Sequence, residues 1–218
     1  MFWISIWKDI LLIFKEKMFW IVEGAFVFIA CIIAVMMNLQ TNGISISNSV
    51  FQLSFPLTMA YATMTFIPIG DYHREQRNGS FLYLMSTGLS IKKYAISKGI
   101  VLSIMIYLPS FAFLLVSTDF DILLKVVHVI LIYFCALNMS LWYTYEIIYS
   151  TNPMKTMGKA SMLAMGLFLL LSISVRIKTS YFNYDMVILI LGMLNIISLI
   201  SFVIKLNNLH IETIVCRR

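Results

Sequence analysis

Six apolar blocks separated by short polar segments constrain this chain more than any other feature. The blocks span residues 19–39, 50–69, 99–116, 126–145, 160–175 and 186–204. At a helical rise of 1.5 Å per residue, each block is about long enough to cross a hydrocarbon core about 30 Å thick. Because lipid offers the backbone no hydrogen bonds, spans of this length must be helices. The sequence therefore predicts an all-α, polytopic membrane protein with six transmembrane helices in a single transmembrane domain, 1–218.

The composition leaves little room for other classes of protein. Hydrophobic residues make up 61% of the chain and charged residues 12%, whereas an ordinary soluble domain has about 25% charged residues. The longest segment outside the predicted spans, 70–98, is too short for a separate soluble catalytic domain. Cys31, Cys135 and Cys216 are far apart, which fits neither a disulfide framework nor a metal site. We expect no metal ion and no cofactor in this chain.

Basic residues are distributed unequally between the two sides of the predicted bundle. Most of the 16 Lys and Arg residues lie before the first span, in 70–98, after the fourth span and in the tail. The alternate segments contain only Lys125, Arg176 and Lys178. By the positive-inside rule, we expect a multi-pass protein of the cell membrane with cytoplasmic N- and C-termini. Proximity to anionic lipid headgroups explains the net charge of +6, so no nucleic-acid partner is expected.

Residues 1–18 have the pattern of an amphipathic helix. Ser5, Lys8, Asp9 and Glu16 recur at helical spacing, and Trp and Ile residues fill the other side. Tryptophan is favoured at the depth of the lipid headgroups. The segment is predicted to be an interfacial helix that lies flat on the membrane before the first span.

The loop 70–98, between the second and third spans, contains a charged stretch and then a short amphipathic run. The apolar residues of this run are close to three- and four-residue spacing, and they are Phe81, Leu82, Leu84, Met85 and Leu89. Ser86 and Gly88 can end such a helix. The pattern predicts a short cytoplasmic helix parallel to the membrane. Its apolar face packs either on the ends of its own spans or on a soluble partner, and the spacing favours neither.

The order of residues in this loop carries a family resemblance. A charged cluster, a Gly-Ser pair, a Leu-rich turn, a break residue and a Lys in the next span follow one another, at Arg74, Glu75, Arg77, Gly79, Ser80, Leu82, Leu84, Gly88 and Lys98. With the flat N-terminal helix, six spans and both ends inside, the chain resembles the permease subunits of ABC transporters of the type-2 exporter class, similar to small peptide or bacteriocin exporters and immunity permeases. Two positions depart from the family pattern: Tyr83 stands where an acidic residue is frequent, and Gly88 stands where proline is frequent.

The resemblance implies a coupling helix in 70–98 that docks on a cytoplasmic ABC ATPase subunit through Arg74, Glu75, Arg77, Gly79, Ser80, Leu82, Leu84 and Gly88. The sequence contains no phosphate-binding loop of the G-x-x-x-x-G-K-[ST] type, so ATP and Mg are assigned to the partner, and the chain itself is not expected to be an enzyme. A second permease subunit, either a copy of this chain or a related one, would complete the export pathway. The expected cargo is amphipathic, with a peptide or an antimicrobial or toxin peptide favoured by the Met and aromatic content.

Ionisable residues within spans are candidates for function, because they are costly in lipid. Glu23 lies about one turn inside the first span, and Glu146 lies at the cytoplasmic end of the fourth. Both are shallow enough to reach headgroups or loops. Alternatively, they close an inner gate by pairing with basic residues, of which Lys15, Lys17, Lys155 and Lys159 are nearest in sequence.

Uncharged polar residues also occur in the second and fourth spans, at Thr58, Thr63, Thr65, Asn138, Ser140, Thr144 and Tyr145. These either hydrogen-bond between helices or line a passage.

Two other functions fit the same pattern of spans. The first is a membrane immunity or anchor protein that acts by binding alone. The second is an intramembrane enzyme, which would need paired carboxylates or a nucleophile facing a His within the bilayer. Most acidic residues here lie at the predicted helix ends, which disfavours the enzyme. A soluble ATPase that copurifies through 70–98 would distinguish the exporter from both.

Overall fold

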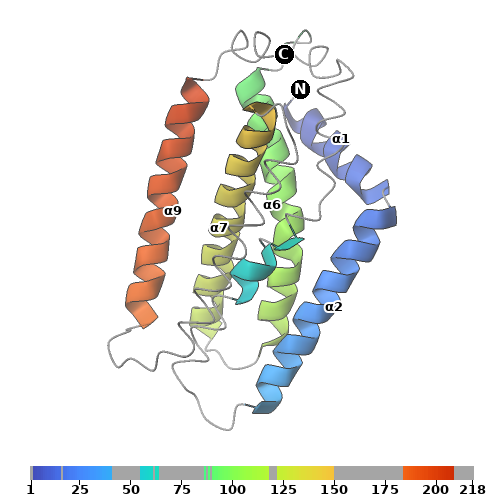
Figure 1. Ribbon diagram of the computed structural model, residues 1–218, viewed down its shortest axis with the longest axis vertical. Coiled ribbons are helices and arrows are strands. Elements are labelled where there is room, and N and C mark those ends of the chain that lie inside the picture. Colours follow the sequence, from blue (N-terminus) through green and yellow to red (C-terminus); the bar gives the residue numbers. More distant parts are fainter. Residues whose placement is uncertain are drawn as a thin grey trace.

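The described part of this protein is entirely helical apart from short turns. A computed structural model describes residues 2–15, 17–40, 55–60, 62–63, 86, 88, 90–117, 122–149 and 184–208, among which no strand occurs. The main helices are α1 (Phe2–Lys15), α2 (Lys17–Gln40), α6 (Ile91–Val116), α7 (Ile122–Tyr149) and α9 (Tyr184–Asn207). Helices α2, α6, α7 and α9 run along the long axis, and α1 is inclined to them at one end (Figure 1). The predicted all-α class is confirmed for these residues.

Four of these helices are long and apolar enough to cross a membrane. Their apolar segments are Phe19–Met36, Ile91–Val116, Lys125–Ile148 and Ile188–Asn207. They correspond to the first, third, fourth and sixth predicted spans. The second predicted span is represented only by the helical residues 55–60 and 62–63. The fifth, 160–175, lies outside the described residues, so the count of six stays a prediction.

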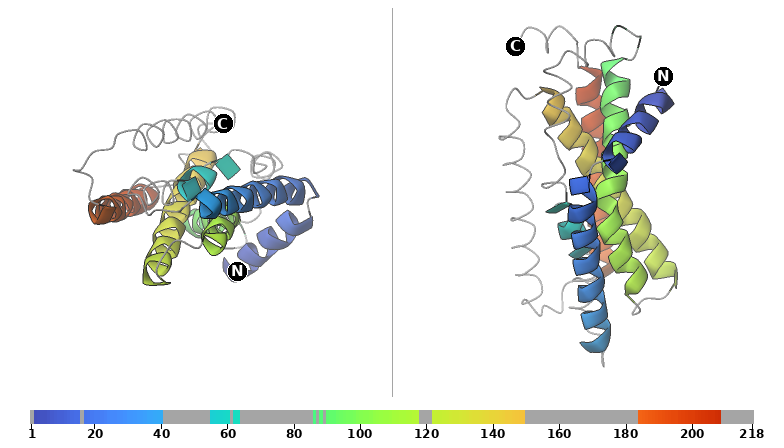
Figure 2. Two further views of the ribbon diagram at one scale, coloured as in Figure 1. Left: turned by 90° about the horizontal axis from the view of Figure 1, so that it is seen from below. Right: turned by 90° about the vertical axis from the view of Figure 1, so that its right-hand side faces the viewer.

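Helix α6 is the centre of the described bundle. It packs against α7, α2 and α1, whereas α9 packs mainly against α7. Helices α9 and α2 lie on opposite sides of the α6–α7 pair in both Figure 1 and Figure 2. The end of α9 also reaches the start of α6, because Lys92 Nζ donates to Asn207 Oδ1 at 3.2 Å.

The bend between α1 and α2 is held by an aromatic pair. Trp20 Nε1 donates to the carbonyl of Phe14 at 2.9 Å, and the two rings meet edge to face with centroids 5.0 Å apart. The hydrogen bond satisfies one of the carbonyls that the end of a helix leaves without an intrahelical partner. The pair therefore fixes the orientation of α1 relative to α2.

The start of α6 is defined by a glycine turn and a serine cap. Gly88 has a φ of +87°, a left-handed conformation that glycine adopts without steric strain and that commonly ends helices. Ser90 is the N-cap of α6, and its Oγ accepts a hydrogen bond from the backbone N–H of Lys93 at 3.3 Å. Such a cap satisfies one of the free N–H groups of the first turn. Helix α6 therefore begins within the predicted loop 70–98, at Ile91.

Most of the predicted docking residues lie outside the described residues. These are Arg74, Glu75, Arg77, Gly79, Ser80, Leu82 and Leu84. Of the docking set, only Gly88 is described, and its role in docking stays a prediction.

Candidate functional site at the junction of helices α1 and α6

A buried ion pair joins the N-terminal helix to α6. Lys98 Nζ lies 2.6 Å from Asp9 Oδ1, and each side chain is only 4% exposed. The ammonium group also lies over the Tyr94 ring, 5.4 Å from its centroid. Nearby, the hydroxyls of Ser5 and Ser97 are 3.4 Å apart. The interface between α1 and α6 is therefore polar and charged at its centre.

Because the ion pair is buried, separating Asp9 from Lys98 is costly. Removing two charges from water is expensive, and a buried ion pair offsets that penalty only when its geometry is good. Once Asp9 and Lys98 are paired, separating them leaves two uncompensated charges in a poorly solvated environment. The pair therefore holds α1 in one position on α6.

The arrangement of α1 differs from that predicted for a simple interfacial helix. The sequence placed Ser5, Lys8 and Asp9 together on one polar side, but Ser5 and Asp9 are buried against α6 while Lys8 is exposed. Trp3 and Trp7 are exposed. The reason is that Lys98 gives Asp9 a partner inside the bundle. Much of the apolar surface of α1 is thus directed outward, toward the region that lipid would occupy, whereas Ile6 is buried.

The two candidate gate residues have different surroundings. Glu23 is 4% exposed, and its Oε1 has no hydrogen-bond partner within the described residues. Neither Lys15 nor Lys17, both of which are exposed, forms an ion pair with it in the described part of the chain. Glu146 on α7 is half-buried. Lys155 and Lys159 lie outside the described residues, so the gate stays a prediction.

A second buried polar atom that has no hydrogen-bond partner within the described residues belongs to α7. Phe19, one helical turn before Glu23, packs in the same apolar cluster as Tyr143 of α7. The hydroxyl of Tyr143 is buried and has no hydrogen-bond partner in the described chain. Such groups are rare in folded proteins because each carries a desolvation penalty. The α2–α6–α7 core therefore contains two polar groups that packing alone does not explain.

A polar network connects α7 to α9. Asn138 Nδ2 donates to Asn195 Oδ1 at 3.1 Å, and its Oδ1 accepts from Ser198 Oγ at 3.0 Å. Trp142 Nε1 donates to Ser198 Oγ at 2.9 Å, and Asn195 Nδ2 donates to Cys135 Sγ at 2.9 Å. Of the two roles predicted for Asn138, the described contacts show hydrogen bonding between helices.

Sequence reasoning did not single out Asn195 and Ser198. They are polar residues three positions apart in the mostly apolar helix α9, so they share one face. Asn138 and Trp142 are four positions apart on α7 and also share one face. Polar residues at similar spacing in two spans could have predicted this contact between α7 and α9, because such groups hydrogen-bond across helices in lipid.

Replacing Asn138 by leucine should weaken the attachment of α9. Its amide makes side-chain hydrogen bonds to Asn195 and Ser198, and interhelical bonds in membranes contribute about 0.6 kcal/mol on average and up to about 1.7 kcal/mol each. We expect Asn138→Leu to lower the free energy of unfolding by about 1–3 kcal/mol in detergent denaturation. Ser140→Ala is the control, since that hydroxyl donates within α7 to the carbonyls of Ala136 and Leu137. Equal losses in both variants would contradict the interhelical role.

The described part of the second apolar block is held to α6 by hydroxyl groups. Ser110 Oγ donates to the carbonyl of Pro56 at 2.7 Å. Thr58 Oγ1 donates within its own segment, to the carbonyl of Phe55 at 2.7 Å. Thr63 Oγ1 also lies 3.0 Å from two carbonyls of its own segment, those of Met59 and Ala60, and 3.4 Å from the carbonyl of Ile106 on α6. The interhelical contact of Thr63 is therefore the longest of its three.

These features define a class rather than a particular protein. Four apolar helices with buried polar contacts indicate an α-helical protein embedded in a membrane. Within the described residues, no group of three or more His, Cys, Asp or Glu side chains is placed to hold a metal ion. No protein-family model, curated protein or solved structure matches the chain.

Proposed function

We propose that this chain is the membrane-spanning permease subunit of an ATP-driven exporter of the type-2 ABC class. It works with a cytoplasmic ATPase subunit and with a second membrane subunit, and it moves an amphipathic cargo, preferentially a peptide. The observation that carries the proposal is the buried pair between Asp9 and Lys98, because it joins α1 to the start of α6, which follows the segment expected to meet the ATPase.

The mechanical link between the docking segment and the bundle begins at the glycine turn. The docking segment before Gly88 is followed by the Ser90 cap and then by the first turns of α6, which contain Lys98. A force applied to the segment before Gly88 therefore acts on the start of α6. Because separating Asp9 from Lys98 is costly at low polarity, α1 and the start of α6 move together. A motor docked before Gly88 would shift both helices as one unit.

The directions of the helices support six spans. Helices α2 and α6 run in the same direction along the long axis, as do α7 and α9 (Figure 1). If all four cross the membrane, the chain must cross back once between α2 and α6 and once between α7 and α9. The second and fifth apolar blocks, 50–69 and 160–175, stand in those two intervals. The start of α6 and the ends of α7 and α9 then share one side, which the basic residues favour as cytoplasmic.

Alanine replacement of both Leu82 and Leu84 tests the docking. We expect the double variant to insert into the membrane normally but to lose the copurifying ATPase and cargo-stimulated ATP hydrolysis, because the apolar face of the coupling segment is truncated. The measurement is ATPase activity of the purified complex with and without added amphipathic peptides. The matched control is Leu189→Ala with Leu194→Ala, which truncates two exposed leucines of α9.

The outcomes separate the candidate functions. Retained peptide-stimulated ATPase activity in the Leu82 and Leu84 double variant would defeat the docking proposal. If the unaltered chain copurifies with no ATPase, a membrane protein that acts by binding alone becomes the better description. Catalysis by the isolated chain would favour an intramembrane enzyme.

A further inference from the structure

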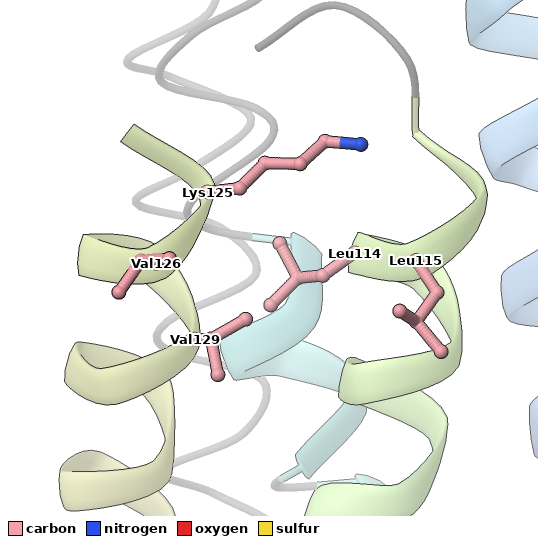
Figure 3. Close-up of a pocket in the computed structure, with 5 residues that line it drawn as sticks. All are labelled: Leu114, Leu115, Lys125, Val126 and Val129. Carbon is pink, nitrogen blue, oxygen red and sulfur yellow. The ribbon is translucent and has the colours of Figure 1, made fainter. Parts of the chain in front are cut away.

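A small pocket lies between the end of α6 and the start of α7. Its volume is about 220 Å³, and it is lined by Leu114, Leu115, Lys125, Val126 and Val129. In Figure 3 the Lys125 side chain extends from α7 toward α6, above Leu114. The described lining therefore combines four aliphatic side chains with one cation.

The pocket lies at the predicted boundary between the hydrocarbon core and the lipid headgroups. The apolar segment of α6 ends at Val116 and that of α7 begins at Lys125. Lys125 thus lies at the boundary of the hydrocarbon core, where charged groups meet lipid headgroups. Val129, one turn further along α7, lies at the depth of the acyl chains. The cation and the apolar lining are ordered as the headgroup and chain of a lipid are.

The pocket opens on the outer surface of the described bundle. Leu115 is 64% exposed and Val126 is 48% exposed, so both rim residues are accessible from the surrounding bilayer. Leu114, by contrast, is buried. A lipid can therefore reach the pocket by lateral diffusion, without leaving the membrane.

We propose that this pocket binds an anionic phospholipid, with the phosphate on Lys125 Nζ and one acyl chain between Leu114 and Val129. The pocket has a volume of about 220 Å³ and is open on one side, so a segment of an acyl chain can enter it from the bilayer. A lysine ammonium is a compact cation that suits a phosphate group. The inference rests on membrane embedding and is independent of the exporter proposal.

Lipid retention in nanodiscs tests this site. The full chain is reconstituted in equal amounts of phosphatidylglycerol and phosphatidylcholine with matched chains, and the lipids that stay bound are counted by native mass spectrometry. We expect phosphatidylglycerol to be retained preferentially. Lys125→Gln should reduce that preference about five-fold, the effect of one basic residue on an anionic lipid. Val129→Phe should displace both lipids by filling the pocket.

Two controls match these variants. Lys93→Gln removes an exposed lysine at the other end of α6, and Ile130→Phe adds the same aromatic bulk at the neighbouring, exposed position of α7. Ile130→Phe should leave lipid retention unchanged. Lys93→Gln should reduce the preference for phosphatidylglycerol less than Lys125→Gln does, because Lys93 does not line the pocket. Undiminished preference for phosphatidylglycerol in Lys125→Gln would overturn the proposal, as would equal effects of Val129→Phe and Ile130→Phe. Competition by millimolar inorganic phosphate would show that free phosphate, rather than a lipid, occupies the site. Failure of the ATPase test with lipid retention intact would defeat only the exporter proposal.

Discussion

Lys98→Met is expected to lower the free energy of unfolding by about 3–5 kcal/mol, because it leaves the Asp9 carboxylate buried without its cation. The two side chains are 2.6 Å apart and each is 4% exposed, so water cannot replace the lost partner without moving α1. The measurement is unfolding of the purified chain in mild detergent. Faster hydrogen exchange at the backbone of α1 (Phe2–Lys15) should report release of that helix from α6.

A double variant separates the ion pair from general packing. Asp9→Asn combined with Lys98→Met removes both charges, and we expect it to regain most of the stability lost in Lys98→Met, since replacing a buried pair by neutral groups is often tolerated. Lys8→Met is the control for loss of one positive charge on α1, because Lys8 is exposed; we expect a change within about 0.5 kcal/mol. A double variant as unstable as Lys98→Met would show that the pair does not hold α1 in place.

The spans were predictable because hydropathy is a local property. The apolar blocks 19–39, 99–116, 126–145 and 186–204 each fall within one of the described long helices. The helix boundaries extend beyond the blocks, most clearly at α6, which begins at Ile91. Its first turns contain Lys92, Lys93 and Lys98, and these charges hid the helical extension from a search for apolar runs.

The contacts between helices were harder to predict, for a physical reason. Asp9 and Lys98 are separated by 89 positions, and no periodicity within α1 reveals that its acidic residue has a partner on another helix. The amphipathic pattern of 1–18 was recognised, but the direction of its polar side depended on Lys98. The docking residues between Arg74 and Leu84 lie outside the described residues, so the sequence remains the only basis for their role.

Gly99→Ala is the second change with a large expected effect. A Cβ at position 99 would lie 2.6 Å from Leu141 Cδ2 and 3.2 Å from Leu141 Cα. The Leu141 side chain can rotate away, but its Cα can move only if α7 moves. We expect a loss of about 1–3 kcal/mol in the free energy of unfolding, typical of overpacking, and a larger loss for Gly99→Val.

Two other glycines provide matched controls. A Cβ added to Gly24 on α2 or to Gly192 on α9 would meet nothing within 4 Å among the described residues, so Gly24→Ala and Gly192→Ala should be neutral or slightly stabilising through higher helix propensity. Equal stabilities of Gly99→Ala and Gly192→Ala would contradict the close approach of α6 and α7.

A double-mutant cycle with Leu141→Ala identifies which atom limits the approach of the helices. If Leu141 Cδ2 is the main obstacle, Gly99→Ala should lower the free energy of unfolding much less in the Leu141→Ala background. If Leu141 Cα is the main obstacle, the loss in stability should be the same in both backgrounds.

Lys98 and Gly99 are adjacent in α6. Lys98 binds α1, and Gly99 allows α7 to approach closely. A Cβ that pushed α7 away would also shift the backbone that carries Lys98. We therefore expect Gly99→Ala to increase hydrogen exchange at the backbone of α1, an effect that Gly192→Ala should not have.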